Sequence, residues 1–321
     1  MSEMISPERL AGAVGAALGV DPGALEFTRC RTGKYNFTWF MEGYSEPLAV
    51  RVAPQDKREI NLFYEHRMMR QEPELHRTIL NRTSMPVPRI LHADFSHEHL
   101  ERDFLIMERC PGVMVSDYHG LSRGEWDRAL GELGSKLRQV HAVHSGYYGY
   151  IGEHRPMQPQ TDWTSAFVVM WNSLLDDIEG CGGYETREAD ALRSLLDSRL
   201  DCFTRTEPAC LLHMDIWAQN ILLLPGGRLS CLLDWDRSLR GDPEIEFAVL
   251  DYCGISEPAF WEGYGEKRPH DREARVRQGF YLLYELQKYI FIRRVRGGNP
   301  YLADNYRRQS LELAASLGLR L

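Results

Sequence analysis

The chain has 321 residues, of which 43% are hydrophobic, enough for one large domain or two closely packed ones. Its 38 basic and 46 acidic residues give a net charge of −8, so it lacks the basic excess that a general nucleic-acid binder needs. The seven cysteines contain no C-x-x-C pair, and the first residues lack a secretory-signal pattern. No apolar run approaches the ~20 residues that span a bilayer. We therefore expect a cytoplasmic protein that does not bind membranes.

The first third of the chain is predicted to combine short strands with two helices. Ser6 and Pro7 begin the first helix, since serine is a favoured N-cap and proline is favoured at the first helical position. A longer helix is predicted over 57–81, and Pro86 and Pro88 exclude helix just after it. The extended stretches, separated by turns, are 25–30, 36–42, 47–52, 89–95 and 103–109.

After Cys-Pro-Gly at 110–112 the pattern becomes mostly helical. Ser122 and Glu125 form a capping box for a helix that runs to about residue 144. The later helices are predicted over 162–180, 186–204, 271–296 and 301–317. Between them, short strands surround a hairpin at 225–227, and Asp-Pro-Glu at 242–244 begins another helix.

These elements predict an α+β fold with two lobes. The smaller lobe, 1–109, contains an antiparallel sheet and one main helix. Residues 110–112 form a hinge, and 113–321 form a larger, mostly helical lobe. A cleft between two such lobes is the expected position of a functional site.

An apolar run, LLHMDIWAQNILLL, is interrupted by polar residues at fixed spacing. Asp215 and Asn220 stand five residues apart, and Asp234 ends the next apolar strand. This spacing is typical of phosphoryl-transfer enzymes that hold a base and magnesium. Asn220 and Asp234 would supply oxygen ligands to Mg²⁺, and Asp215 would orient an attacking hydroxyl and accept its proton. His213 is expected to hold the loop through hydrogen bonds.

With its flanking segments, the pattern resembles the aminoglycoside phosphotransferase family, small-molecule kinases related to choline, homoserine and macrolide kinases. LLHMDIWAQNILL resembles the catalytic loop of that family and LLDWDRSLRGDPEIEFA its metal-binding segment. FLIMERCPG resembles its hinge, and MPVPRIL the approach to its fourth strand. The match keeps a consistent order over roughly residues 28–255. The resemblance implies a bilobal protein-kinase-like fold.

The resemblance also implies where the nucleotide, ATP or GTP, binds. The Glu108 carbonyl and the Cys110 amide would hold the adenine edge, and Met107 would line the pocket. The stretch RTGKYNFTW stands where the phosphate loop is expected, although it has a single glycine. Its candidate phosphate-binding residues are Gly33, Lys34 and Asn36.

Arg51 stands on the third strand, where the family usually has lysine. Arginine also pairs with phosphates and with a helix carboxylate, but it is bulkier than lysine. Glu72 is the expected ion-pair partner of Arg51, and Glu65 is the competing candidate. For Glu65 itself the favoured interpretation is a solvated helix face.

The acceptor site is the least specified part of the sequence. The helix over 162–180 ends with an acidic group, and a further aspartate follows the metal-binding Asp234. The candidate acceptor-binding residues are Asp176, Asp177, Glu179 and Asp236. Such carboxylates would bind the amines of a cationic substrate, while a solvated helix end is the alternative for the first three.

Together these features predict an ATP- or GTP- and Mg²⁺-dependent phosphotransferase that acts on a hydroxyl of a small molecule, for which a cationic compound is one candidate. By family analogy the acceptor is an antibiotic of aminoglycoside type. One alternative is a metabolic small-molecule kinase of the same fold, acting on an amino alcohol or a sugar. A second is a nucleotide-binding pseudokinase regulator, suggested by Arg51 and the thin phosphate loop. A metal-dependent hydrolase would need clustered histidines, which the sequence lacks.

Overall fold

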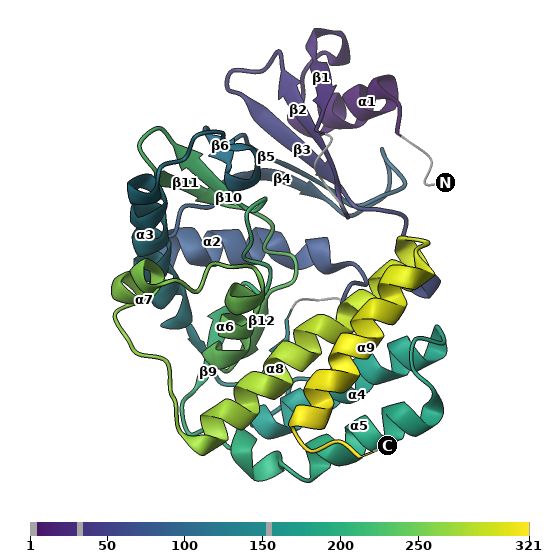
Figure 1. Ribbon diagram of the computed structural model, residues 1–321. Coiled ribbons are helices and arrows are strands. Elements are labelled where there is room, and N and C mark those ends of the chain that lie inside the picture. The colour runs from purple at the N-terminus through teal and green to yellow at the C-terminus, as the bar shows by residue number, and fades with distance from the viewer. Residues whose placement is uncertain (1–4, 31–34, 152–155, 321) are drawn as a thin grey trace.

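A five-stranded antiparallel sheet forms one end of the molecule in this computed structural model, which describes residues 5–30, 35–151 and 156–320 (Figure 1). The strand order is β1-β2-β3-β5-β4, and each neighbouring pair is antiparallel. The five strands are β1 (Glu26–Arg29), β2 (Phe37–Glu42), β3 (Leu48–Val52), β4 (Ile90–Asp94) and β5 (Phe104–Glu108). All five extended stretches predicted for this part of the chain are therefore present as strands.

Helix α1 (Pro7–Leu18) covers this sheet and begins as predicted. The Ser6 hydroxyl accepts a hydrogen bond from the Arg9 N–H, and Gly19 ends the helix in the left-handed conformation that glycine adopts without a Cβ clash. Leu10 and Val14 of the helix pack on Trp39, Val50 and other strand residues. This cluster gives the sheet a hydrophobic core of its own.

The predicted helix over 57–81 is present only in its second part. Helix α2 spans Glu72–Arg82, and two short 3₁₀ turns, η2 (Arg58–Ile60) and η3 (Met68–Gln71), precede it. Pro73 explains the correction, because it lacks the N–H of a helix interior and is tolerated only in the first turn. The helix therefore cannot extend through Pro73 and begins at Glu72.

The rest of the chain forms helices and two small sheets, with strand orders β11-β10-β6 and β7-β9-β12-β8. The helices are α3 (Arg123–His141), α4 (Trp163–Gly180), α5 (Thr186–Asp197), α6 (Pro243–Tyr252), α7 (Pro258–Tyr264), α8 (Arg272–Phe291) and α9 (Pro300–Ser316). The strands are β6 (Val113–Met114), β7 (His144–Ser145), β8 (Gly149–Tyr150), β9 (Ala209–Leu212), β10 (Ile221–Leu224), β11 (Arg228–Leu232) and β12 (Leu239–Gly241).

The local signals behind these helices are confirmed, with some changes in their ends. The capping box of Ser122 and Glu125 begins α3, and Asp242 caps α6 by accepting the Glu244 N–H. The helix expected over 186–204 ends at Asp197, and a 3₁₀ turn, η5 (Leu200–Phe203), follows it. A π-helical turn, η6 (Ile292–Arg296), completes the stretch that begins with α8. Helix α7 was not predicted.

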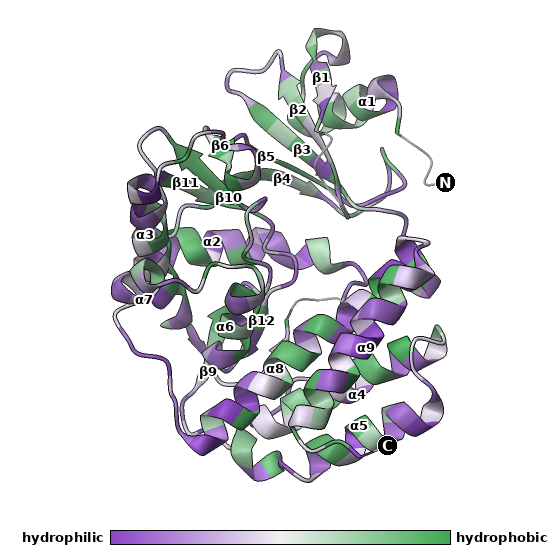
Figure 2. Ribbon diagram, viewed as in Figure 1, coloured by the Kyte–Doolittle hydropathy of each residue, from purple (hydrophilic) through white to green (hydrophobic). Residues whose placement is uncertain are grey.

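Two further hydrophobic clusters fill the larger part of the molecule. One lies around α4 and α8, and it buries completely the predicted apolar face of α4: Phe167, Met170, Trp171, Leu174, Leu175 and Ile178. The other joins Leu75 and Ile79 of α2 to Leu130 and Leu133 of α3 and to strands β10 and β11, whose residues are mostly hydrophobic in Figure 2. Helix α2 thus shares its core with α3.

The predicted α+β class is confirmed by these elements. Among the described residues, no helix combines the length and the apolar character that crossing a lipid bilayer requires.

Candidate active site

The loop between β9 and β10 carries the first two predicted site residues. The Asn220 side-chain amide donates to the Asp215 backbone carbonyl at 2.8 Å and to the Asp215 carboxylate at 2.9 Å. Asn220 is buried and Asp215 is half-buried. The five-residue spacing therefore closes a loop in which Asn220 fixes the orientation of the Asp215 carboxylate.

His213 makes the hydrogen bonds predicted for it. The Asp215 N–H donates to His213 Nδ1 at 3.1 Å, so the ring proton resides on Nε2. Nε2 lies 2.9 Å from the Leu233 carbonyl, to which it can then donate. His213 is fully buried, and it connects the loop to the residue just before Asp234.

The peptide just before Asp215 is held in an unfavourable conformation. Met214 has φ 68°, in the left-handed region that costs a non-glycine residue about 1–2 kcal/mol. Its N–H donates to a carboxylate oxygen of Glu246 on α6, and its carbonyl accepts from Arg237 Nη1 at 2.7 Å. Arg237 in turn binds Glu285 on α8 at 3.0 Å, and Glu246 binds His141 at 2.7 Å. A buried ion pair on one side and a buried hydrogen-bonded carboxylate on the other thus hold the peptide that precedes Asp215.

Glu246 lies in the first turn of helix α6. It is fully buried beneath the loop. Burial acts to raise its pKa, but hydrogen bonds from His141 and Met214 and the nearby His213 hold that pKa below the ordinary value for glutamate. The residue is therefore a buried anion that positions the loop.

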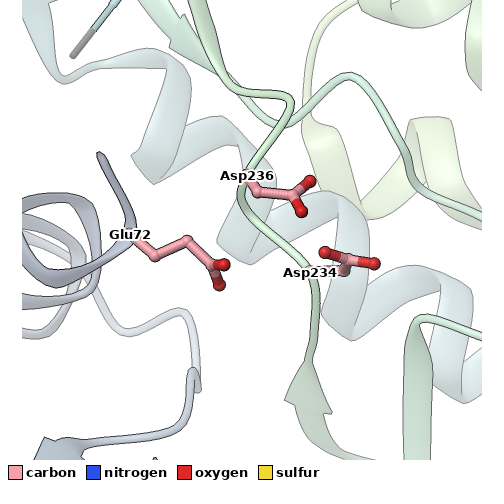
Figure 3. A group of neighbouring side chains, drawn as sticks. All are labelled: Glu72, Asp234 and Asp236. Carbon is pink, nitrogen blue, oxygen red and sulfur yellow. The ribbon is translucent and has the colours of Figure 1, made fainter. Parts of the chain in front are cut away.

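A second group of charged residues gathers around Arg51. Arg51 Nη1 lies 2.5 Å from a Glu72 carboxylate oxygen, and Nη2 lies 2.5 Å from Asp234 and 3.4 Å from Asp236. Figure 3 shows Glu72 reaching toward the loop that carries both aspartates. One oxygen from each carboxylate lies within 4.8 Å of the other two. We call Arg51, Glu72, Asp234 and Asp236 the Arg51 cluster.

The ion pair predicted between Arg51 and Glu72 is therefore present. The competing candidate, Glu65, is also buried, so the expectation of a solvated helix face was wrong. Its carboxylate accepts the Leu62 N–H at 2.8 Å and pairs with Arg296 at 3.0 Å. A sequence pattern could not reveal this pairing, because Arg296 comes from the far end of the chain.

Two amide side chains from the first part of the chain bind Asp236 of the Arg51 cluster. Asn36 Nδ2 donates to the Asp236 carboxylate at 2.8 Å, and the Gln71 side chain donates to the Asp236 carbonyl. Asn36 is buried, and its phosphate-binding role stays a prediction. The other two phosphate-loop candidates, Gly33 and Lys34, lie outside the described residues.

The burial of Asp236 has a consequence for its protonation. Burial raises the pKa of the Asp236 carboxyl well above its usual value, and the nearby Asp234 and Glu72 carboxylates add to the effect, while Arg51 and Asn36 oppose it. Asp236 was predicted to bind the acceptor, but the structure places it in the Arg51 cluster.

We expect Asp236→Asn to raise the free energy of unfolding at neutral pH, because the wild-type protein must either ionise this buried carboxyl or keep it protonated above its ordinary pKa. Because the folded pKa is raised, the wild-type protein loses stability as pH rises from the unfolded pKa toward the folded one. The side chain of the variant does not ionise, so the difference in free energy of unfolding between the variant and the wild type should grow over that pH interval. Urea unfolding from about pH 4 to about pH 8 measures this difference. Asp304→Asn on exposed α9 is the control, and parallel curves for all three proteins would contradict the expectation.

Asp234 also has a left-handed backbone, with φ 66°. We expect Asp234→Gly to be more stable than Asp234→Ala by about 1 kcal/mol, because both lose the carboxylate and only alanine keeps the Cβ clash. The same pair of substitutions at Asp190, inside α5 and exposed, should give the opposite order, since glycine weakens a helix. Chemical denaturation of the four variants tests this, and equal stability of the two Asp234 variants would count against it.

The donor set of this site fits a magnesium ion. Magnesium prefers hard oxygen ligands, and the Arg51 cluster contains three carboxylates against a single guanidinium. The Asn220 carbonyl accepts the Leu233 N–H at 2.8 Å, which places Asn220 beside the segment with Asp234. Because Asn220 Nδ2 is bound to Asp215, its Oδ1 is the side-chain atom suited to a metal. Asn220 and Asp234 stay the predicted ligands.

The predicted hinge follows β5. Glu108 N–H donates to the Arg89 carbonyl at 2.9 Å, and Glu108 pairs with Leu48 of β3 in the sheet. Met107 is buried in a small apolar cluster with Met69 and other residues of the sheet. Cys110 is half-buried and contacts Cys231. The nucleotide-binding roles of Met107, Glu108 and Cys110 stay predictions.

The predicted acidic acceptor group lies at the end of α4, where its members have other partners. Arg193 of α5 binds Asp176 at 2.6 Å and Glu179 at 3.3 Å, while Asp177 accepts the Phe63 N–H at 2.7 Å. Asp176 is exposed. The structure does not join these three residues to the Arg51 cluster, and their acceptor role stays a prediction.

The chain is similar in sequence to known proteins. The model of a family described as phosphotransferase enzyme family matches residues 26–278. The mouse (Mus musculus) protein acyl-CoA dehydrogenase family member 10 is 22% identical over an alignment of 240 residues, and the match covers 72% of this chain and 21% of that protein. The chain therefore spans about a fifth of the length of this curated relative.

Solved structures of small-molecule kinases are similar in fold. A putative fructosamine-3-kinase from Haemophilus somnus 129PT superposes with a TM-score of 0.67 and 15% identity, covering 96% of each chain. The ternary complex of streptomycin, ATP and APH(2")-IIa gives 0.65 and 17%, covering 99% of this chain and 100% of that one. A thermostable mutant of aminoglycoside phosphotransferase APH(4)-Ia with ADP and hygromycin B gives 0.64 and 18%, covering 93% and 96%. The bilobal kinase-like fold predicted from the sequence is thus confirmed.

Proposed function

This chain belongs to the phosphotransferase enzyme family, and we propose that it transfers the γ-phosphoryl group of ATP or GTP, with magnesium, to a hydroxyl group of a small molecule. The observation that carries this proposal is that two segments bring the required groups together. The loop orients Asp215 through Asn220, and the next strand presents Asp234 to Arg51. The ATP and ADP complexes of the kinases with a similar fold support the choice of nucleotide.

Each residue has a role that its chemistry allows. Asp215 orients the acceptor hydroxyl and takes its proton, which in enzymes contributes roughly 10²–10⁴-fold to the rate. Arg51 supplies a permanent positive charge for the phosphates, and Glu72 holds its guanidinium. Asn220 and Asp234 would hold the magnesium ion, which when bound neutralises charge on the triphosphate. Glu246 and Arg237 hold the peptide at Met214 in its left-handed conformation, which keeps Asp215 oriented before the substrate binds.

The first candidate for the acceptor is an antibiotic of aminoglycoside type. The support is the fold, which this chain shares with kinases whose complexes contain streptomycin or hygromycin B. These molecules carry several amines, so their recognition needs carboxylates in the acceptor site. Asp176, Asp177 and Glu179 would have to exchange their present partners to serve that purpose.

A second candidate, a metabolic acceptor such as a sugar or an amino alcohol, is favoured by the charges around Asp215. The buried cations whose charge interacts with Asp215 are Arg237 and Lys288. Glu285 pairs with both, at 3.0 Å and 2.5 Å. Together with Asp215, these four side chains carry two positive and two negative charges, so they offer no excess negative charge to hold a substrate with several amines. A hydroxyl compound with few or no positive charges needs no such excess.

Magnesium-dependent consumption of ATP and GTP, with product mass, tests the proposal. The acceptor panel should include amine-rich antibiotics, neutral sugars and amino alcohols. A product heavier by one phosphoryl group would establish the reaction, and the class of acceptor that yields it would decide between the two candidates. Nucleotide binding without product from either class would contradict catalysis and support the regulator alternative. Absence of nucleotide binding would refute the nucleotide site.

A further inference from the structure

Two cysteines meet where the hinge crosses strand β11. The Sγ atoms of Cys110 and Cys231 lie 2.7 Å apart, although 121 residues separate them in the chain. This distance lies between an ordinary contact of two sulfur atoms and the disulfide bond length of about 2.0 Å, so a small shift of the side chains brings the atoms to bonding distance. Both residues are free thiols in this structure. Neither has a role in the reaction proposed above that depends on its side chain.

The backbone around both cysteines holds them together. Val113 and Met114 of β6 pair with Leu223 and Leu222 of β10, and Ser230 donates a hydrogen bond to the Pro111 carbonyl. Gly112, at φ +117°, packs so closely that a Cβ there would lie 2.6 Å from the Leu223 carbonyl oxygen. The segment that follows Cys110 is therefore fixed against the β10–β11 hairpin. The meeting of the two thiols follows from this packing.

The two cysteines differ in their accessibility. Cys110 is half-buried, so a small oxidant can reach it, whereas Cys231 is buried. Burial raises the pKa of the Cys231 thiol well above its ordinary value, and the contact with Cys110 adds to this effect. Because the thiolate is the form that attacks an oxidant, Cys110 is the residue that reacts first. Cys231 is placed to react second.

We propose that Cys110 and Cys231 are an oxidation site at which a hydroperoxide forms a disulfide between the hinge and β11. The Cys110 sulfur attacks the peroxide O–O bond and becomes a sulfenic acid, and the leaving oxygen departs as water or an alcohol. The Cys231 sulfur then displaces the hydroxyl from this sulfenic acid, forming the S–S bond and releasing water. Two thiols are oxidised and one peroxide is reduced.

The disulfide would close a covalent loop that contains the segment between Cys110 in the hinge and Cys231 in β11. Cross-linking distant residues limits the freedom of the unfolded chain, so the melting temperature should rise by about 5 °C on oxidation. The link also connects the hinge to the strand that ends two residues before Asp234. This site is independent of the proposed reaction and can be tested without a substrate.

The experiment compares the full chain after reduction by a dithiol with the same protein after limited hydrogen peroxide treatment. Remaining thiols are alkylated, and peptides are mapped by mass spectrometry without reduction. We expect a cross-linked peptide joining Cys110 to Cys231, lost on reduction, together with the higher melting temperature. Both effects should persist in Cys202→Ser, which removes another half-buried cysteine, and disappear in Cys110→Ser.

Two results would overturn the proposal. One is oxidation of Cys110 to its sulfinic acid with Cys231 still alkylated as a free thiol. The other is a rise in melting temperature that persists in Cys110→Ser, because that rise would arise elsewhere. If Cys110→Ser does not fold, peptide mapping of the wild-type protein still decides the question.

Discussion

Replacing Asp215 with asparagine is expected to lower kcat for phosphoryl transfer by about 10²–10⁴-fold, the usual contribution of a general base. The variant keeps the size of the side chain and an oxygen that can accept from Asn220 Nδ2, so the loop geometry should persist. It cannot accept the hydroxyl proton. The measurement is kcat with the acceptor identified by the assay, together with nucleotide affinity and melting temperature.

The control for Asp215→Asn is Asp176→Asn, which removes an exposed carboxylate from the end of α4. It should retain kcat if Asp176 is a helix-end residue, and should raise the KM for a cationic acceptor if it binds one. Wild-type kcat in Asp215→Asn would contradict the role of base. A loss of nucleotide affinity and of melting temperature would instead indicate that the substitution damages the fold of the loop.

Replacing Arg51 with methionine is expected to destabilise the fold by about 3–5 kcal/mol, the cost of leaving buried charges without their partner. Methionine has a similar length but no charge, so Glu72, Asp234 and Asp236 would lose their shared cation. Urea unfolding measures the loss. Arg51→Lys should recover part of it, because lysine keeps the charge but cannot bind two carboxylates with separate nitrogen atoms of a rigid fork.

A double-mutant cycle makes the Arg51 prediction specific. Combining Arg51→Met with Asp236→Asn removes one of the uncompensated carboxyl groups, so the second change should restore more stability in the Arg51→Met background than in the wild type. If the two effects simply add, the charges are not coupled and the cluster does not depend on Arg51. If Arg51→Met is as stable as the wild type, the prediction is wrong.

The elements that the sequence predicts best are those with local signals. Ser122 with Glu125 and Asp242 with Pro243 are sufficient to begin helices α3 and α6, because a cap acts on the backbone next to it. The same local logic applied to Pro73 would have shortened the predicted helix before α2. The error there came from composition, since Glu, Arg, Leu and Met favour a helix without deciding where it starts.

The site divides in the same way. Spacing along the chain brings Asp215 and Asn220 together, because a loop of five residues returns on itself. Contacts between distant segments have no such signal. Three sets of such contacts depend on the packing of the whole chain: the hydrogen bonds of Gln71 and Asn36 to Asp236, the ion pair of Arg296 with Glu65, and the hydrogen bond of the Met214 N–H to Glu246. The sequence therefore indicates which residues carry the chemistry, while their supporting partners required the structure.

The apolar contacts of α2 have a mechanical consequence. Leu75 and Ile79 attach α2 to α3, whereas the five-stranded sheet that carries Arg51 has a separate core with α1. The ion pair between Arg51 and Glu72 therefore joins two elements that belong to separate hydrophobic cores. A rotation of the sheet relative to the helices would change the length of this ion pair.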